Sequence, residues 1–244
     1  MYPIICHIGP LTVYSYGLML AVAVLICAFF LSKEASRRGI PPELILDLLF
    51  WVVLSGLAGA RAFYIFLNLD YYIHEPLEIF MLHHGGLAFQ GGLIAGFVAG
   101  IVFLKRKSLP LLSTLDFLAP YIALGHAIGR VGCFLNGCCF GNPVSWGIYF
   151  PSHHAHLHPT QLYESMGLLI IFLFLKRREC HSKYPGEIFI LYLVFSSLLR
   201  FVNEFFRADH AEIFLNLSIF QIVSLIILGV AVYVNTIIKS RFGK

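Results

Sequence analysis

The sequence alternates long runs of apolar residues with short polar breaks. The first run, Tyr14–Ser32, contains no charged residue, and as a helix its 19 residues would extend about 28 Å, close to the thickness of the hydrocarbon core of a bilayer. Six further runs follow the same pattern, although the fifth is short and begins beside Glu164. We therefore predict about seven transmembrane helices, at Tyr14–Ser32, Leu48–Leu69, Gly86–Leu104, Leu109–Gly129, Leu162–Leu175, Glu187–Phe206 and Ile213–Ile238.

Composition supports a membrane protein. Of the 244 residues, 59% are apolar and 12% are charged, whereas about a quarter of the residues of an ordinary soluble domain are charged. This balance excludes a soluble globular protein with a large core. No internal repeat or low-complexity linker divides the chain. We therefore predict an all-α polytopic membrane protein that forms a single domain over residues 1–244.

Basic residues gather at alternate breaks between the apolar runs. Basic loops stay on the cytoplasmic side of a membrane, so the N-terminus is predicted outside and the C-terminus in the cytoplasm. The chain starts without a basic segment, and no small-residue cleavage site follows the first run, so no signal peptide is expected. All but four of the 17 basic residues lie after the first, third, fifth and seventh runs: Lys33, Arg37, Arg38, Lys105, Arg106, Lys107, Lys176, Arg177, Arg178, Lys183, Lys239, Arg241 and Lys244.

Four arginines lie in or beside the apolar runs instead: Arg61, Arg130, Arg200 and Arg207. A charge in the hydrocarbon core costs at least a few kcal/mol, so it normally faces a polar cavity and has a partner. Arg61 is interpreted as structural, either reaching the outer headgroups or forming a buried ion pair. Arg200, Glu204 and Arg207 are spaced i, i+4, i+7 and share one helix face. Because guanidinium binds phosphate through two parallel hydrogen bonds, these arginines predict an anionic ligand at the outer boundary, such as a phospholipid headgroup.

Five short motifs occur in an order that points to one family. They are "YSYGLML" near the start, "GGLAFQGGLI" at the third run, "GRVGCFLNGCCFG" at Gly129–Gly141, "HPTQLYES" at the fifth run and "RFVNEFFR" on the sixth. In these motifs, and over nearly its whole length, the chain resembles bacterial prolipoprotein diacylglyceryl transferases. The third motif matches in frame the family pattern G-R-x-G-N-F-x-N-x-E-x-x-G.

The resemblance implies a reaction at the outer face of the bacterial plasma (inner) membrane. Enzymes of this family transfer the diacylglyceryl group of phosphatidylglycerol to the lipobox cysteine thiol of a preprolipoprotein, which forms a thioether and releases glycerol 1-phosphate. This is the first step of lipoprotein maturation. The expected partners are therefore phosphatidylglycerol, preprolipoprotein signal peptides and the bilayer, and no nucleic acid. The resemblance implies no cofactor and no metal.

The resemblance and the chemistry of the residues together give candidate roles. Arg130 and Arg200 occupy motif positions suited to holding the phosphate and neutralising the charge of the leaving group. Tyr16 matches the tyrosine of the family's first span, and Glu204 is placed to orient Arg200 or to accept a proton through water. The predicted catalytic residues are His126, Arg200, Glu204 and Tyr16, and the predicted substrate-binding residues are Arg130, Gln90, Asn136 and Arg207.

The identity of the general base is open in this chain. Gln90 stands where the family often has a histidine before a Gly-Gly pair, and glutamine takes up no proton at neutral pH. His126, one helical turn before the motif arginine, is the leading substitute, and His84 is another. Each histidine is alternatively a polar residue at the membrane interface.

Three cysteines at the outer boundary allow several interpretations. Cys133 and Cys138 replace the asparagine and the glutamate of the family motif, and Cys139 follows directly. On the oxidising side of the membrane, Cys133 could form a disulfide with either of the others. The thiols could also bind zinc together with the histidines of "SHHAHLHPT", or simply fill space as small side chains. They are not expected to be the nucleophile, because the substrate supplies the reacting thiol.

Two further features are interpreted as structural. Gly92, Gly96 and Gly100 recur every four residues in the third run, a spacing that lets helices approach closely. The segment Asn142–Pro159, rich in aromatic residues and histidines, is predicted to form a small outer cap at the membrane interface.

Three alternative functions use the same residues. An anion transporter or channel would use the arginines as a pathway, although no inverted repeat is visible. A metal-binding or thiol-redox membrane protein would use the outer cysteines. A diverged member of the family, with altered or lost activity, would explain Gln90 and the missing motif glutamate.

Overall fold

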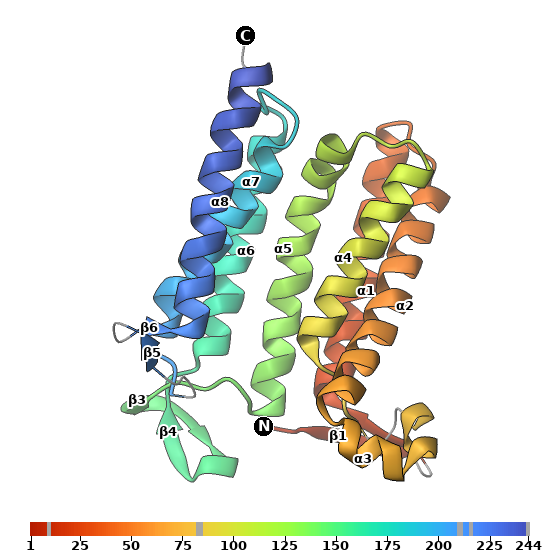
Figure 1. Cartoon of the computed structure of the whole chain (residues 1–244). Helices are drawn as coiled ribbons and strands as arrows, with labels where there is room; N and C mark the ends of the chain where they lie inside the picture. Colours follow the sequence, from red (N-terminus) through yellow and green to blue (C-terminus); the bar gives the residue numbers. More distant parts are fainter. Residues whose placement is uncertain (9–10, 82–84, 209–211, 215–216, 243–244) are drawn as a thin grey trace. The chain divides into compact units, whose positions relative to one another are not determined.

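In a computed structural model of the chain, residues 1–8, 11–81, 85–208, 212–214 and 217–242 are described (Figure 1). A short helix, α3 (Leu69–His74), and a 3-10 helix, η1 (Pro76–Phe80), follow the second long helix. Each segment predicted to be an apolar helix overlaps one of the long helices, which confirms the predominantly helical class. The long helices are α1 (Ser15–Arg37), α2 (Pro42–Leu67), α4 (Phe89–Arg106), α5 (Leu111–Asn136), α6 (Thr160–Glu179), α7 (Glu187–Glu204) and α8 (Ile219–Phe242).

The ends of two helices differ from the prediction in the region of the candidate site. α5 continues past its predicted end to Asn136, where Gly137 adopts the left-handed conformation that ends many helices, with φ 77°. α6 begins at Thr160 and has 20 residues, so it is longer than the predicted run Leu162–Leu175. An apolar run stops at the first polar residue, whereas helical hydrogen bonding continues through polar residues.

Among the described residues, five helices are long and apolar enough to cross a membrane: α1, α2, α4, α5 and α8. The chain is therefore a multi-pass helical membrane protein. α6 and α7 have 20 and 18 residues but carry more charge. α7 contains Glu187, Arg200 and Glu204, and α6 contains Glu164 and a basic last turn. The two helices that are less apolar thus carry much of the candidate site.

Two short antiparallel hairpins precede helices, and the sequence did not predict them. β1 (Ile4–Ile8) pairs with β2 (Leu11–Tyr14) before α1. β5 (Glu212–Phe214) pairs with β6 (Leu217–Ser218) before α8. Because these last strands pair with each other, α8 begins later than the predicted Ile213.

The predicted outer cap is a third antiparallel hairpin. It consists of β3 (Pro143–Phe150) and β4 (Ala155–Leu157), joined by the 3-10 turn η3 (Pro151–His153). Phe150 pairs with Ala155 in the register of the two strands and is fully buried. The cap therefore has regular structure of its own, which the composition of the segment did not indicate.

The described chain forms two compact units. The first consists of residues 1–27 and 112–244, and the second of residues 28–111. The single domain over the whole chain stays a prediction.

The core of the first unit joins three helices. Ala119, Ala123 and Ala127 of α5 are almost completely buried together with Leu168 of α6 and Ile188 of α7. Alanines at a spacing of four residues form a flat stripe, which lets the neighbouring helices approach closely. In the same unit, α7 and α8 lie side by side and share a second, smaller apolar cluster (Figure 1).

A buried carboxylate fixes the start of α7 against α5. Asp116 of α5 accepts hydrogen bonds from the backbone amides of Gly186, at 2.6 Å, and Phe189, at 2.9 Å. The first amides of a helix have no partner within the helix, so an acceptor from another helix stabilises them. Asp116 therefore has a structural role.

Glycines bring α2 and α4 into close contact in the second unit. A Cβ atom added at Gly92 would lie 3.1 Å from the carbonyl oxygen of Gly56, and one at Gly96 would lie 3.3 Å from that of Val52. At Gly91 a Cβ atom would overlap the backbone of Gly59. The predicted packing role is confirmed for Gly92 and Gly96 and extends to Gly91, whereas Gly100 makes only an ordinary contact.

This packing gives a stability prediction for two glycines of the same helix. Gly91→Ala is expected to lower the free energy of unfolding by about 1–3 kcal/mol, because the added methyl group has no space. Gly100→Ala is the matched control, since its Cβ atom would lie 3.5 Å from Cγ2 of Val52, an ordinary contact. Thermal unfolding of the two variants in the same detergent measures the difference. Equal melting temperatures would contradict the close packing.

Arg61 is structural, as interpreted from the sequence. It is 6% exposed, and its guanidinium donates to the backbone carbonyls of Ile79, at 3.1 Å, and Gly85, at 2.6 Å. It also donates to the carbonyls of Glu78 and Gly86. The side chain thus ties η1 and the glycine pair Gly85–Gly86 to α2 through carbonyl groups, rather than through the expected headgroups or carboxylate.

Candidate active site

Charged residues from three helices meet in the first unit. Arg130 lies near the end of α5, Glu164 in the second turn of α6, and Arg200 and Glu204 in the last turns of α7. These consecutive helices run antiparallel, so the end of α5, the start of α6 and the end of α7 lie at the same end of the bundle (Figure 1).

Glu164 is at the centre of this group. The residue is 2% exposed. Its Oε1 atom lies 2.9 Å from Nη2 of Arg130, and its Oε2 atom lies 3.3 Å from Nη1 of Arg200. Nδ2 of Asn203 donates to Oε2 at 3.1 Å. One buried carboxylate therefore holds the guanidiniums of two different helices at a fixed separation.

Glu204 links Arg200 to the next arginine. Its Oε2 atom lies 3.0 Å from Nη2 of Arg200 and 3.5 Å from Nε of Arg207. Its Oε1 atom accepts a hydrogen bond of 2.9 Å from the hydroxyl of Ser218. Glu204 and Arg207 are 1% and 5% exposed. The predicted helical face is confirmed for Arg200 and Glu204. Arg207 lies beyond the end of α7, in a backbone bridge with Gly141, yet its side chain still reaches Glu204.

Together these side chains form what we call the charge network, in which cations and anions alternate. Its three guanidiniums and two carboxylates leave one net positive charge. In the described structure the Nε atom of Arg130 is buried and makes no hydrogen bond. Buried donors normally have an acceptor, so this atom stands out among the donors of the charge network. The members of the charge network are Arg130, Glu164, Arg200, Glu204 and Arg207.

The backbone around Arg207 is tied to the glycine-rich segment that follows α5. Gly141 and Arg207 form an antiparallel bridge, and the amide of Asn142 donates to the carbonyl of Phe206 at 2.8 Å. The motif that contains Arg130 and the motif that contains Arg207 are therefore neighbours in space.

Two further predicted residues lie beside the charge network. Nε2 of His126 is 3.7 Å from Oε1 of Glu164, and the histidine side chain is 38% exposed. Tyr16, in the first turn of α1, packs near Gly132 of α5, where an added Cβ atom would lie 3.4 Å from Cδ2 of the tyrosine. Tyr16 also lies within electrostatic range of Arg130. The structure thus brings His126 and Tyr16 to the predicted site, while their roles stay predictions.

Comparison with known proteins identifies related sequences. The sequence model of the family "Prolipoprotein diacylglyceryl transferase" matches residues 3–237. The phosphatidylglycerol–prolipoprotein diacylglyceryl transferase of Lysinibacillus sphaericus (strain C3-41) is 36% identical over 253 aligned positions, which cover 98% of this chain and 92% of that protein. The protein of the same name from Staphylococcus aureus (strain MSSA476) is 34% identical over 242 positions, which cover 94% and 86%. The Staphylococcus xylosus protein is 31% identical, with coverage of 98% and 90%.

The chain belongs to the prolipoprotein diacylglyceryl transferase family. This confirms the resemblance inferred from the five motifs. In this family member, the charge network contains four of the predicted site residues and one that was not predicted, Glu164.

The predicted substrate-binding residues Gln90 and Asn136 belong to different units. Asn136 ends α5, two residues before Cys138. Gln90 is the exposed second residue of α4, in the second unit. His84, the second candidate base, lies outside the described residues. Roles for Gln90 and Asn136 stay predictions.

Glu164 and Asn203 were missed as site residues. Besides contacting Glu164, Asn203 donates to the carbonyl of Thr160 at 3.2 Å, which ties α7 to the start of α6. The sequence did contain an indication of Glu164, because this carboxylate lies in the motif "HPTQLYES" on an apolar helix. A search for a carboxylate partner for each arginine of the apolar helices would have identified Glu164 as a site residue.

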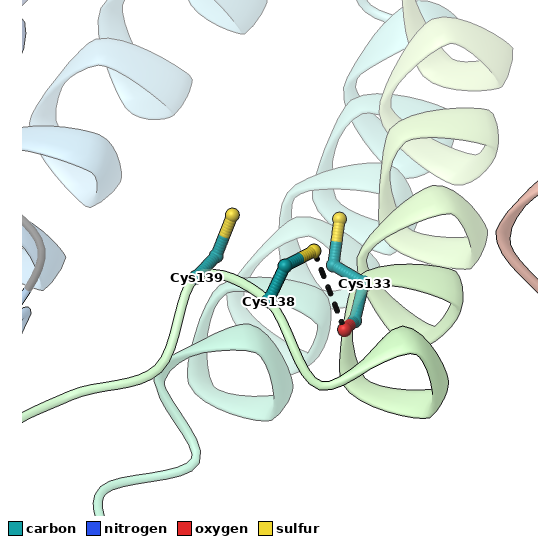
Figure 2. A group of neighbouring side chains, drawn as sticks. All are labelled: Cys133, Cys138 and Cys139. Atoms are coloured by element: carbon teal, nitrogen blue, oxygen red, sulfur yellow. Dashed lines mark hydrogen bonds between the residues drawn. The ribbon is translucent and has the colours of Figure 1, made fainter. Parts of the chain in front are cut away.

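The thiols of Cys133, Cys138 and Cys139 lie together at the end of α5 and in the following turn (Figure 2). Their Sγ atoms all lie within 4.8 Å of one another. All three are free thiols, so the disulfide considered from the sequence is not formed in the structure. Hydrogen bonds from Cys133 and Cys138 lower the pKa of Cys139, and the guanidiniums of Arg207 and Arg130 act in the same direction.

The histidines of the cap do not join these thiols. In the part of the chain that the structure describes, this group of candidate metal ligands contains cysteines only. His158 shares a hydrogen bond of 3.1 Å with the hydroxyl of Tyr163, and His153 packs against Phe140 with ring centroids 3.9 Å apart. His153 and His158 therefore make aromatic and hydrogen-bonded contacts away from the thiols, and the mixed cysteine and histidine zinc site stays a hypothesis.

Proposed function

We propose that this transferase moves the diacylglyceryl group of phosphatidylglycerol to the lipobox cysteine thiol of a preprolipoprotein. The charge network carries the assignment of the phosphate site. It has one net positive charge, and the buried Nε–H of Arg130 has no acceptor within the described structure. A phosphodiester group carries one negative charge and accepts hydrogen bonds from guanidinium. It would therefore supply both the missing charge and the missing acceptor.

The proposed membrane topology has seven spans, with α6 and α7 added to the five apolar helices. Basic residues end α1, α4, α6 and α8, which supports a cytoplasmic location for those ends. Glu164 and Glu204 are almost completely buried and paired with arginines, so their charges need not face lipid. This orientation puts the charge network near the outer face of the bacterial inner membrane and leaves the N-terminus outside.

The network fits the charge changes of the reaction. The substrate sulfur attacks the glyceryl carbon that carries the phosphate oxygen, so a carbon–sulfur bond forms while the carbon–oxygen bond breaks. The oxygen keeps the bonding electrons, and the departing glycerol 1-phosphate gains one negative charge. Arg130 and Arg200 stabilise that charge, and Glu164 holds the two guanidiniums in position before the reaction begins.

The thiol must also lose its proton. A free thiol has a pKa of about 8.5, and nearby positive charge favours the thiolate. His126 is the proposed proton acceptor, since its ring lies beside the network and is partly exposed. The positive electrostatic potential of the arginines contributes more to the reaction rate than His126 does.

His126→Ala is therefore expected to slow lipidation by about 10²-fold at neutral pH, the lower end of the usual contribution of a general base. Raising the pH should restore part of the rate, because the thiolate then forms without a base. Arg200→Ala, measured alongside, should show no such recovery, since it loses the stabilisation of the leaving phosphate. The measurement is a pH–rate profile with a lipobox peptide and phosphatidylglycerol vesicles. A wild-type profile for His126→Ala would make the histidine an interfacial residue only.

Complementation tests the proposed function in cells. The chain is expressed in a bacterium depleted of its own transferase, and conversion of a preprolipoprotein to its lipidated form is followed. Lipidation by the wild-type chain is expected. Its absence, with the protein present in the membrane, would favour a diverged family member, and anion flux in proteoliposomes would favour a transporter.

A further inference from the structure

The three outer thiols converge although they come from different local structures. Cys133 belongs to the last turns of α5, whereas Cys138 and Cys139 follow the helix end at Gly137 (Figure 2). Cys139 has φ 63°, a left-handed conformation that is uncommon for a residue with a side chain. This turn brings its Sγ atom within 4.8 Å of the other two.

Buried side chains of α6 hold that turn in place. Nε2 of Gln161 donates to the carbonyl of Cys138 at 2.6 Å, and Oγ1 of Thr160 donates to the carbonyl of Cys139 at 2.6 Å. Gln161 and Thr160 are 1% and 0% exposed. The convergence of the thiols is therefore built into the packing of α6 against the end of α5.

We propose that Cys133, Cys138 and Cys139 bind one Zn²⁺ ion as thiolates and that its fourth position binds the thiol of the substrate cysteine. Zinc is bound by thiolates at about 2.3 Å in tetrahedral sites, which places pairs of sulfur atoms about 3.8 Å apart. The sulfur atoms here need to move by about 1 Å at most. Sites with three protein ligands and one open position are typical of catalytic zinc.

No fourth protein ligand belongs to the group within the described chain. Cys138 and Cys139 are only half-buried, so the sulfur atoms are not sealed from a ligand that approaches from outside. Thiolate ligands select zinc or copper(I) over magnesium and calcium. Three cysteines without a fourth protein ligand in the described chain therefore fit zinc that receives a substrate thiol.

Charge also favours the proposed ion. Zn²⁺ with three thiolates has one net negative charge. The guanidinium of Arg130 lies within electrostatic range of Cys133 and Cys139, and that of Arg207 within range of Cys139. The metal site would therefore adjoin the charge network, and the same arginine would face both the sulfur that attacks and the phosphate that leaves.

The inference rests on the proposed transferase function and supplies the activation that Gln90 cannot. A thiol that coordinates zinc is deprotonated, so binding of the lipobox cysteine releases one proton to solvent or to His126. The zinc-bound sulfur then attacks the glyceryl carbon, the carbon–oxygen bond breaks, and glycerol 1-phosphate leaves with the electron pair. The thioether product is a weaker ligand than a thiolate and dissociates from the metal.

Elemental analysis of the full-length protein, purified without chelator, tests the site directly. We expect about one zinc per chain in the wild type and in Cys180→Ser, whose exposed cysteine lies outside the group, and loss of the zinc in Cys139→Ser. Three reactive thiols without zinc, or an intact mass that shows a disulfide between them, would overturn the proposal. Melting temperatures identify a variant that loses metal only because it unfolds.

Cobalt substitution keeps the test independent of any variant. Co²⁺-loaded wild-type protein should show sulfur-to-cobalt charge-transfer absorption, and a lipobox peptide with cysteine should change the spectrum while the same peptide with serine should not. An absorption spectrum that neither peptide changes would overturn the proposal that the substrate thiol binds the fourth position of the metal. Lipidation is measured on the same preparation: activity without metal would remove this inference alone, and metal without activity would remove the proposed transferase function.

Discussion

Replacing Arg130 with alanine is expected to reduce thioether formation by about 10²–10³-fold or more, while the protein still folds and enters the membrane. Arg130 is the one network arginine whose buried Nε–H has no acceptor in the described structure, and its Nη2 is fixed by Glu164 at 2.9 Å. Its loss removes a donor to the leaving phosphate and leaves Glu164 with fewer cations. The measurement is lipidation of a lipobox peptide by the purified variant in vesicles.

Two further variants separate the role of Arg130 from a general loss of charge. Arg130→Lys should recover little activity, because an ammonium group cannot reproduce the planar fork of guanidinium. Arg38→Ala is the matched control, since Arg38 forms an exposed i, i+4 pair with Glu34, which contributes little to stability. Near-normal turnover by Arg130→Ala would remove Arg130 from the phosphate site.

Glu164→Gln is expected to affect both activity and stability. Glutamine is almost the same size but has no charge, so the guanidiniums of Arg130 and Arg200 would be left close together with one carboxylate fewer. Removing one partner of a buried ion pair typically costs about 3–5 kcal/mol. We therefore expect a markedly lower melting temperature and little lipidation. Thermal unfolding and peptide lipidation, measured on one preparation, give both quantities.

The control for Glu164→Gln is Glu43→Gln, at an exposed position in the first turn of α2. That change should leave activity intact and alter stability by a few tenths of a kcal/mol, the usual effect of a charge near a helix terminus. If Glu164→Gln matched the control in both measurements, the carboxylate could not be what positions the two arginines.

The sequence was sufficient to predict those features of the structure that depend on a single helix. Apolar runs located all seven long helices, because burial or lipid contact requires continuous apolar residues. The pairing of Arg200 with Glu204 followed from helical periodicity alone, whereas Arg207 reaches Glu204 from beyond the end of α7. The glycine stripe of α4 likewise predicted close packing, since its spacing fixes where a neighbour can approach.

Contacts between helices were harder to predict from the sequence. The position of Glu164 between Arg130 and Arg200 depends on how α6 packs between α5 and α7, which no spacing within α6 encodes. The cysteines are separated along the chain by the end of a helix. Their convergence depends on left-handed conformations at Gly137 and Cys139, which the sequence pattern did not predict.

A balance of the two reaction products tests the proposed chemistry most directly. The purified protein is incubated with phosphatidylglycerol vesicles and a lipobox peptide, and the thioether on the peptide and free glycerol 1-phosphate are both quantified by mass spectrometry. The account predicts equal amounts of the two products, neither of them with a serine peptide or with Arg130→Ala. Glycerol 1-phosphate released without the cysteine peptide, or no thioether from folded wild-type protein, would contradict it.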